Sequence, residues 1–383
     1  MKLLVFAHVP PPLHGQSQMV QYLVEGLRAD PALGIEVIHV DARLSDGLED
    51  VGTARGGKLP RLLRYCAQAI GQRWKRGVTT LYYVPSPPKR ASLYRDWIVL
   101  ALLRPWFRDI VFHWHSVGLG EWLATQARPW ERWLSHLLLG RATLSIVLAE
   151  TNRADAERLG PRRIAVVSNG VADPCPDFAL TLGVERAARF ARRQAEDGEV
   201  QVLFMALCVR DKGVFDAVEA IALANELGAG EPTPLRFRLT VGGAFPTPEL
   251  EREFQQLLRD RGAAECVEHV GFLQGEAKAA ALRTADVFLF PTYYANEGQP
   301  LGVAEAMAFG LPVVTTRWRA IPEMLPAGSP GLVEPRQPAQ AAAALLTMVK
   351  RSDGWDHRAE FERKFKLEAH LRAMAQALRT VGR

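Results

Sequence analysis

The sequence from Ala285 to Val314, ADVFLFPTYYANEGQPLGVAEAMAFGLPVV, places a helical run between two strand-like runs. The apolar run that ends near Phe290 predicts a buried strand, and a second strand is predicted to begin at Pro312. Between them, residues 301–308 are good helix formers, and Gly310 follows as a stop signal. A strand, a loop, a helix and a strand in this order form a β/α unit, which predicts a parallel sheet covered by helices.

Short apolar runs alternate with helical segments along the rest of the chain as well. They lie at 3–7, 36–40, 79–84, 110–115, 144–148 and 164–167, and then at 200–206, 236–241, 267–270, 287–290 and 312–315. Between the two sets, residues 169–177 contain an Asn-Gly pair and two prolines, which mark a break. We therefore expect an α/β fold of two Rossmann-like, doubly wound domains that face each other across a cleft. The expected domains are 1–172 and 173–354, followed by amphipathic helices over 355–383.

The composition is that of a folded protein. Of the 383 residues 48% are hydrophobic and 23% are charged, and the net charge is only +5, which excludes a disordered chain. Four scattered cysteines, none in a C-x-x-C pair, argue against a disulfide scaffold or a zinc site and suit a reducing cytoplasm. We expect no signal peptide, because the first apolar run is short, and no transmembrane helix, because no uncharged run is long enough.

Two glutamates, Glu297 and Glu305, flank the start of the predicted helix at 301–308. A helix N-terminus suits a phosphate, because it carries free N–H groups and a partial positive charge. A carboxylate can accept from two neighbouring hydroxyls, at about 1.5–3 kcal/mol for each hydrogen bond. This layout predicts a diphosphate with a sugar on one side and a ribose on the other. The alternative is a surface glutamate in a loop and a helix-start glutamate favoured by the dipole.

The Glu-x7-Glu spacing of Glu297 and Glu305, followed by Ala-Met-Ala-x-Gly-Leu-Pro-Val over 306–313, resembles the retaining glycosyltransferases of family 4. The likeness is sharpest over 200–315 and mostly architectural before that. It implies the GT-B fold, with the nucleotide-sugar in the C-terminal domain and the helices of 355–383 returning to the N-terminal domain. It further implies that Glu297 faces the donor sugar as a catalytic residue and that Glu305 binds the ribose.

A second match lies over 202–214, where a predicted strand leads into a charged loop that ends in Lys-Gly. The resemblance implies that Lys212 binds the donor diphosphate and stabilises it as the leaving group. The arginine usual in the family sits nearer the strand end, where this chain has Leu207 and Cys208, so we expect Arg210 to supply that charge from a shifted position. The alternative for Lys212 is a solvated loop lysine.

The chain has no Asp-x-Asp motif to hold a divalent ion on a diphosphate. We therefore expect no metal and no cofactor, with the phosphate charges met by Lys212, Arg210 and helix N–H groups. Three residues near the helix start offer backbone N–H groups to the donor, namely Gly298, Gln299 and Leu301. Pro300 lacks such a group, which departs from the family pattern.

The first domain is expected to supply the other wall of the site. After the first strand, the family usually has Gly-Gly where this chain has His14 and Gly15, and Gly15 should allow close approach to the donor. Family members often have a histidine near the transferred sugar at the end of a later strand. His115 is the candidate here, with a core histidine as the alternative, whereas His113 is expected inside the sheet.

Residues 51–133 are rich in basic and aromatic side chains. Over 51–110 there are twelve Lys or Arg against two acidic residues, an excess of ten where the whole chain has +5, and seven of the nine tryptophans lie between Trp74 and Trp133. This pattern is typical of attachment to an anionic membrane surface, and the acceptor would then be a lipid-linked sugar. Core tryptophans with a solvated basic face are the alternative. No nucleic-acid-binding motif accompanies the patch.

These observations predict a retaining glycosyltransferase that moves a sugar from a UDP- or GDP-sugar to an acceptor hydroxyl in surface polysaccharide or glycolipid assembly. It would act in the cytoplasm, at the inner face of the cytoplasmic membrane. Two rivals share the architecture: a nucleotide-sugar 2-epimerase, and a catalytically silent sugar-nucleotide-binding protein. A nicotinamide dehydrogenase is disfavoured, because no G-x-G-x-x-G follows any predicted strand.

Overall fold

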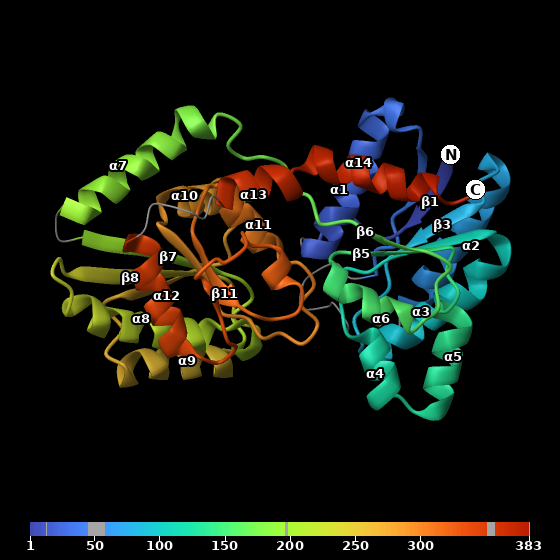
Figure 1. Cartoon of the computed structure of the whole chain (residues 1–383). Helices are drawn as coiled ribbons and strands as arrows, with labels where there is room; N and C mark the ends of the chain where they lie inside the picture. The colour runs from blue at the N-terminus through green and yellow to red at the C-terminus, as the bar shows by residue number, and fades with distance from the viewer. Residues whose placement is uncertain (13, 45–57, 196–197, 351–356, 383) are drawn as a thin grey trace. The chain divides into compact units, whose positions relative to one another are not determined.

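The computed structural model describes residues 1–12, 14–44, 58–195, 198–350 and 357–382. The chain forms two compact units. Unit 1 comprises Met1–Gly170, Asn296–Gln299 and Leu367–Arg383, and unit 2 comprises Val171–Ala295 and Pro300–Lys366. Each unit contains a six-stranded parallel sheet with helices on both faces (Figure 1). The predicted α/β fold with two doubly wound sheets is therefore confirmed.

The sheet of unit 1 has the strand order β2-β1-β3-β4-β5-β6. Its strands are β1 (Lys2–Phe6), β2 (Glu36–Val40), β3 (Thr80–Tyr83), β4 (Asp109–His113), β5 (Leu144–Val147) and β6 (Ile164–Val166). Its helices are α1 (Gly15–Ala29), α2 (Lys58–Arg76), α3 (Arg90–Leu103), α4 (Leu119–Thr125), α5 (Pro129–Leu139), α6 (Arg153–Glu157) and α14 (Leu367–Arg379). Short 3₁₀ turns are η1 (Pro31–Leu33), η3 (Arg104–Trp106) and η4 (Glu150–Asn152).

Strand β1 lies in the interior of that sheet and contributes to two cores. Leu4 and Phe6 belong to the core covered by α2, α3 and α5. Leu3 and Val5 belong to the core on the other face, with residues of α1 and α14. Successive side chains of a strand point to opposite faces, so burial on both faces requires the unbroken apolar run seen in the sequence.

The sheet of unit 2 has the strand order β12-β11-β10-β7-β8-β9. Its strands are β7 (Gly198–Met205), β8 (Leu235–Gly242), β9 (Val267–Gly271), β10 (Val287–Phe290), β11 (Val313–Thr316) and β12 (Leu332–Val333). Its helices are α7 (Leu182–Ala195), α8 (Val214–Ala229), α9 (Pro248–Asp260), α10 (Gly275–Thr284), α11 (Leu301–Ala308), α12 (Pro338–Lys350) and α13 (His357–Lys364). Its 3₁₀ turns are η5 (Phe178–Leu180), η6 (Arg210–Lys212) and η7 (Ile321–Glu323).

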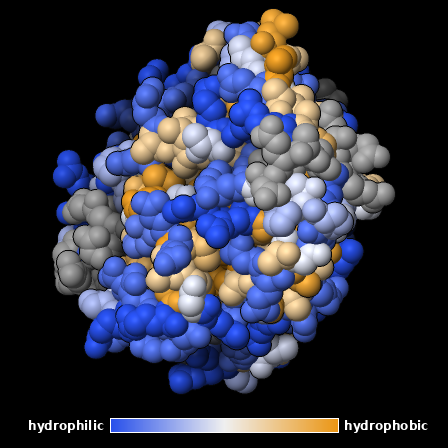
Figure 2. All heavy atoms as spheres, turned by 90° about the vertical axis from the view of Figure 1, so that its left-hand side faces the viewer, coloured by the Kyte–Doolittle hydropathy of each residue, from blue (hydrophilic) through white to orange (hydrophobic). Residues whose placement is uncertain are grey.

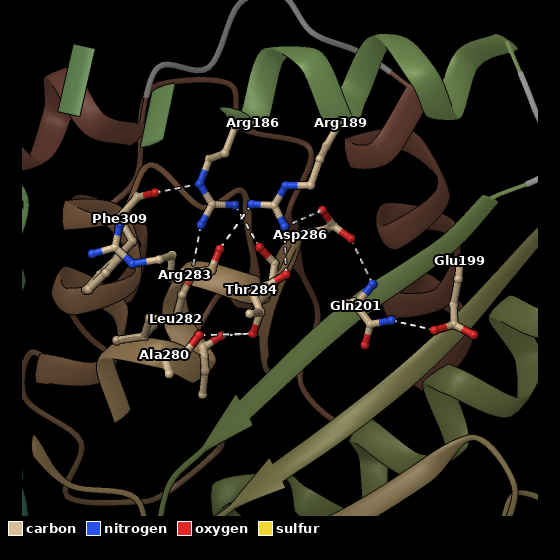
Figure 3. Close-up of polar contacts among 12 residues, drawn as sticks. Arg186, Arg189, Glu199, Gln201, Ala280, Leu282, Arg283, Thr284, Asp286 and Phe309 are labelled. Carbon is tan, nitrogen blue, oxygen red and sulfur yellow. Dashed lines mark hydrogen bonds and ion pairs between the residues drawn. The ribbon is translucent and has the colours of Figure 1, made fainter. Parts of the chain in front are cut away.

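Helix α7 is attached to the rest of unit 2 through two arginines that bind the C-terminal end of α10 (Figure 3). Arg186 donates hydrogen bonds of 2.7–2.9 Å to three carbonyl oxygens, those of Leu282, Ala285 and Phe309. Arg189 donates to the carbonyl oxygens of Arg283 and Thr284, at 3.0 and 2.9 Å. The last carbonyls of a helix lack partners within it and lie at the negative end of its dipole, so two cations stabilise this contact. Burial lowers the pKa of Arg186 to about 10.

A mostly buried ion pair fixes the beginning of unit 2. The guanidinium of Arg358, on α13, donates to both carboxylate oxygens of Asp173, at 2.9 and 2.6 Å. It also donates to the carbonyl oxygens of Ala308 and Cys175. Burial alone would raise the pKa of Asp173, but the hydrogen bonds from Arg358 and from the Cys175 N–H outweigh it and lower that pKa. One side chain therefore joins α13, the end of α11 and the first residues of the unit.

The two C-terminal helices pack in different units. Helix α14 lies beside α1 in unit 1 (Figure 1), whereas α13 packs against α11 in unit 2. The predicted segment 355–383 is therefore divided between the units. No helix among the described residues has the length and apolar character needed to cross a bilayer. Figure 2 shows a mostly hydrophilic face of the molecule, on which apolar side chains gather in small groups.

Candidate active site

The candidate site of unit 2 lies at the carboxyl ends of β7 and β10, the neighbouring strands at which the strand order reverses. Ligands of doubly wound sheets bind at this switch point. Turn η6 follows β7, and the loop that leads toward α11 follows β10. Gly213 ends η6 with a φ of +85°, and a Cβ atom there would lie 2.3 Å from the carbonyl oxygen of Pro291. Glycine therefore allows the two loops to approach this closely.

The two cations of η6 have different partners. The Lys212 Nζ atom lies 4.5 Å from the ring centroid of Tyr294 and 5.7 Å from that of Phe290, both from the β10 side of the switch point. The Arg210 guanidinium instead forms an ion pair of 2.6 Å with Glu253 on α9. The structure therefore places Lys212 at the switch point, whereas the Arg210 side chain is directed to Glu253 on α9.

Glu305 lies on α11 and is 8% exposed. The Lys278 Nζ atom, on α10, donates to Oε1 of Glu305 at 2.7 Å. No other hydrogen bond to this carboxylate is formed by the described residues, so Oε2 can accept from a ligand hydroxyl. Lys278 precedes Glu305 by 27 residues. No spacing rule connects two such helices, and the sequence analysis therefore missed this lysine.

The start of α11 is suited to an anion. Leu301 is the first helical residue, and no side chain caps the preceding Pro300 position. The first N–H groups of a helix lack carbonyl partners within it and lie at the positive end of the dipole. Unit 2 therefore combines, around its switch point, a lysine, a helix N-terminus and a carboxylate with a free oxygen.

The predicted residues Glu297, Gly298 and Gln299 lie in the segment Asn296–Gln299, which packs in unit 1. A Cβ atom on Gly298 would lie 2.4 Å from the carbonyl oxygen of His115, so only glycine fits there. The Ser116 hydroxyl donates to the carbonyl oxygen of Asn296 at 3.4 Å. Glu297, between these two contacts, is 6% exposed. The structure thus brings this segment to the carboxyl end of β4, beside His115.

The Gln299 side chain ties that segment to unit 1. Its carbonyl oxygen accepts from the backbone N–H of Asn169 at 2.9 Å, and its amide donates to the carbonyl oxygen of Leu148 at 2.8 Å. The Asn169 amide donates in turn to the backbone carbonyl of Gln299 at 3.1 Å. The side chain therefore has a structural role, which leaves only the Gln299 backbone for the predicted donor contact.

Three histidines cluster near the end of β4, namely His113, His115 and His370. The ring centroids of His113 and His115 are 4.1 Å apart, and those of His113 and His370 are 6.5 Å apart. Within the described chain, none of the three Nε2 atoms has a hydrogen-bond partner. Burial lowers all three pKa values, to about 3 for His115 and about 4 for His370, so the rings are neutral at pH 7. His113 lies inside the sheet as predicted, bonded to the Tyr82 hydroxyl at 2.6 Å.

The predicted Gly15 begins α1, and His14 is the N-cap of that helix. The His14 Nδ1 atom accepts from the Ser17 N–H at 3.4 Å, and the His14 N–H donates to the Ser17 hydroxyl at 3.1 Å. His14 Nε2 lies 2.9 Å from Nε2 of His8. Because Nδ1 of His14 accepts, its Nε2 carries the proton and donates to His8. Burial lowers both pKa values, to about 4 for His8.

The two units therefore offer different chemistry. Unit 2 offers a cation, helix N–H groups and a carboxylate, which suit a diphosphate joined to a hydroxyl-bearing group. Unit 1 offers a buried glutamate beside neutral imidazoles, which suit sugar hydroxyls. No group of three His, Cys, Asp or Glu side chains in the described ranges is placed to hold a metal ion. The sequence analysis did not find His8 or His370, because their neighbours come from distant elements.

Comparisons with known proteins find a family match within unit 2. Residues 199–351 match the family model described as glycosyl transferases group 1. The chain is 31% identical, over 188 residues, to the putative colanic acid biosynthesis glycosyltransferase WcaL of Salmonella typhimurium. That match covers 47% of this chain and 44% of WcaL. The chain thus spans less than half the length of this relative.

Solved structures match the fold over the whole chain. Sucrose-phosphate synthase from Thermosynechococcus elongatus has a TM-score of 0.70 and 18% identity, covering 100% of this chain and 99% of that one. Anabaena HepE, solved in complex with UDP, has a TM-score of 0.66 and 15% identity, with 100% of both chains covered. The fold is therefore the GT-B fold, as the resemblance implied.

Proposed function

We propose that this protein, whose residues 199–351 match the group 1 glycosyl transferases, is a retaining glycosyltransferase that uses a nucleoside diphosphate sugar. One observation carries the proposal: Lys212 and the start of α11 lie beside the strand ends at the switch point of unit 2, and Glu305 is borne by the first turns of the same helix. A lysine beside a helix N-terminus neutralises a diphosphate, and the free oxygen of Glu305 accepts from a ribose hydroxyl. HepE, of the same fold, is solved with UDP, which supports a UDP- or GDP-sugar as donor.

In the proposed reaction an acceptor hydroxyl oxygen forms a bond to the anomeric carbon of the donor, on the face from which the diphosphate departs. The bond from that carbon to the phosphate oxygen breaks, and the hydroxyl proton passes to the departing diphosphate. Lys212 and the N–H groups at the start of α11, together with those of Gly298 and Gln299, stabilise the developing charge. Glu297 orients the sugar, and neutral His115 hydrogen-bonds a sugar hydroxyl. No metal takes part.

The acceptor is proposed to be a sugar or lipid-linked sugar of a surface polysaccharide or glycolipid. WcaL is named for colanic acid biosynthesis, and this supports a pathway of that type. Arg210 is proposed to assist Lys212 only weakly, since its guanidinium must first leave Glu253 to reach the diphosphate.

Peripheral membrane contact is proposed through one face of unit 1. Except for Met1, the large exposed apolar side chains of unit 1, as described, lie on α2, α3, η3 and α5: Leu59, Leu63, Trp74, Ile98, Leu102, Trp106, Trp130, Trp133 and Leu137. These helices are neighbours. The acids on α2, α3 and α5 are Asp96 and Glu131, both fully buried, so the charge exposed on this face is basic. Trp97, Trp114 and Trp122 are core residues. An exposed aromatic and basic face suits the inner leaflet of the cytoplasmic membrane.

The test of the proposed function is a panel of UDP- and GDP-sugars, first for binding and then for transfer. A donor at about 100 times its dissociation constant should raise the free energy of unfolding by about 2.7 kcal/mol. Incubation with a lipid-linked acceptor should then give a product with the anomeric configuration of the donor, as read from proton NMR. If no donor stabilises the protein, the assignment of a donor site is contradicted. If incubation with donor alone gives an epimerised sugar, the protein is a nucleotide-sugar epimerase instead.

A further inference from the structure

A groove in unit 1 lies apart from the candidate active site. Its volume is about 610 Å³, and its lining includes Arg104, Trp133, His136, Leu137, Arg141 and Arg158. Arg104 precedes β4, Arg141 precedes β5 and Arg158 precedes β6, so the groove lies at the amino ends of these strands. The histidines and the segment 296–299 lie at the carboxyl ends, at the opposite edge of the sheet.

The groove is positively charged. Of the described residues, no Asp or Glu lines it, and none forms an ion pair with Arg104, Arg141 or Arg158. Arg104 donates instead to the carbonyl oxygens of Gly140, at 2.6 Å, and Arg141, at 3.3 Å, and its own charge is left without a carboxylate. Burial lowers the pKa of this guanidinium. Three like charges that share one groove repel one another, and a bound anion would remove that repulsion.

The walls of the groove are held in place by backbone hydrogen bonds. The Arg141 N–H donates to the carbonyl oxygen of Leu159 at 3.0 Å, and the Arg162 N–H donates to that of Ala142 at 2.8 Å. These bonds join the residues before β5 to those before β6. Arg104 also binds the last carbonyls of α5, as a cation at a helix C-terminus does. The backbone before β5 and β6 and the Arg104 guanidinium are therefore fixed before a ligand binds.

Apolar side chains border the same groove. Trp133 and Leu137, on α5, are 66% and 56% exposed. Both belong to the face of unit 1 proposed above for membrane contact. An arginine fork binds a phosphate through two parallel hydrogen bonds, and exposed tryptophan beside it is typical of a lipid interface. We propose that this groove binds the phosphate headgroup of an anionic membrane lipid, with its acyl chains directed along Trp133 and Leu137.

This inference extends the proposed membrane contact and does not depend on the transferase reaction. It is tested with the full chain and vesicles made of equal parts of phosphatidylcholine and phosphatidylglycerol. The double variant Arg141→Gln/Arg158→Gln should reduce the vesicle partition coefficient by at least about tenfold. The matched control Arg372→Gln/Arg259→Gln removes the same charge from exposed positions outside the groove and should stay within about threefold of wild type.

Two further measurements identify the source of the phosphate and check that the variant is folded. Thermal shift with inorganic phosphate follows the same variants. Stabilisation of wild type but not of the groove variant, with unchanged vesicle binding, would replace the lipid by a soluble phosphate ester. Equal vesicle binding by the groove and control variants, without a phosphate effect, would overturn the site. A cooperative thermal transition like that of wild type reports the folding of the groove variant, and a loss of vesicle binding counts for the groove even in a chain without transferase activity.

Discussion

The Nζ atom of Lys278 lies 2.7 Å from Oε1 of Glu305, and both side chains are largely withdrawn from solvent. The carboxylate proposed to bind the ribose is therefore oriented by a lysine from another helix. One oxygen is occupied by the lysine, and the other is left for the ligand. In the proposed reaction Lys278 is thus a positioning residue, which acts on the donor through Glu305.

Replacing this lysine should weaken donor binding more than it slows transfer. In Lys278→Met, Glu305 loses a charge-assisted hydrogen bond worth about 1.5–3 kcal/mol, and we expect the KM for the donor to rise about tenfold or more while kcat changes less than about threefold. Glu305→Gln should have a similar effect, and the double variant should show less than the sum of the two. Lys350→Met, which removes a comparable pair with Glu231, is the control. Full additivity would show that the two residues act separately.

The two cations of η6 should differ sharply in importance. We expect Lys212→Ala to lower kcat by about 10²–10³-fold, as for removal of one group that stabilises a developing negative charge. Arg210→Ala should lower it less than about threefold, because its guanidinium is paired with Glu253 on α9. Steady-state kinetics with a saturating donor would measure both. A larger loss in the Arg210 variant would mean that Arg210 leaves Glu253 when the donor binds.

The buried histidines should make unit 1 sensitive to acid. Burial depresses the pKa of His370 to about 4, whereas an unfolded histidine has a pKa near 6.5. Between these values the unfolded state binds more protons, so this contribution is complete above pH 6.5 and is lost as the pH falls toward 4. Each pKa unit corresponds to about 1.4 kcal/mol, so His370 should cost about 2 kcal/mol of stability between pH 6.5 and 5.

Tryptophan fluorescence can follow this loss, because seven of the nine tryptophans lie between Trp74 and Trp133 in unit 1. Denaturant unfolding of His370→Gln, whose amide can still donate to the Ser168 carbonyl, should show a smaller pH dependence than wild type. His136→Gln, at an exposed position, should match wild type at both pH values. If the free energy of unfolding of the His370 variant falls with pH as steeply as that of wild type, the titration of His370 does not cause the loss of stability.

The pair of Asp173 and Arg358 should be necessary for the stability of unit 2. Asp173→Asn leaves the mostly buried Arg358 guanidinium with Glu362 as its remaining carboxylate, and we expect a loss of about 1.5–3 kcal/mol in the free energy of unfolding. Arg358→Lys should not restore it, since an ammonium group cannot reproduce the two parallel hydrogen bonds. Arg363→Met removes an exposed arginine from Glu360, which keeps its pair with Lys364, and should cost less than about 1 kcal/mol in the same denaturation experiment.

The exposed tryptophans of unit 1 should contribute to membrane contact. Trp74 and Trp106 are 65% and 43% exposed and touch edge to face, with ring centroids 6.2 Å apart. Trp74→Ser/Trp106→Ser should reduce partitioning onto vesicles that contain phosphatidylglycerol by about tenfold or more. Phe272→Ser, a change at a 51% exposed apolar residue of unit 2, should leave it unchanged. If the tryptophan variant and Phe272→Ser lose vesicle binding equally in a sedimentation assay, membrane contact is not specific to this face of unit 1.

The sequence predicted the elements well because their signals are local. Residues 301–308 form α11, and the run at 144–148 contains β5, since apolar periodicity and stop residues act within one element. The partners of the site residues were not predictable. Gln299 bonds to Asn169, 130 residues away, and a long-range hydrogen bond leaves no trace in local spacing. The basic Trp-rich stretch proved mixed, with Trp97 of α3 in the core and Trp74 of α2 exposed, because each of these helices has a buried and an exposed face.

The membership of α14 in unit 1 has a consequence for synthesis on the ribosome. The apolar face of β1, which is translated first, is completed by Met374 and Leu378, which are translated more than 350 residues later. A nascent chain that carries only residues 1–170 therefore exposes part of an unfinished core throughout the translation of unit 2. We expect chaperones to bind that surface and fragments that lack α14 to aggregate, because the chain completes unit 1 only after it has formed unit 2.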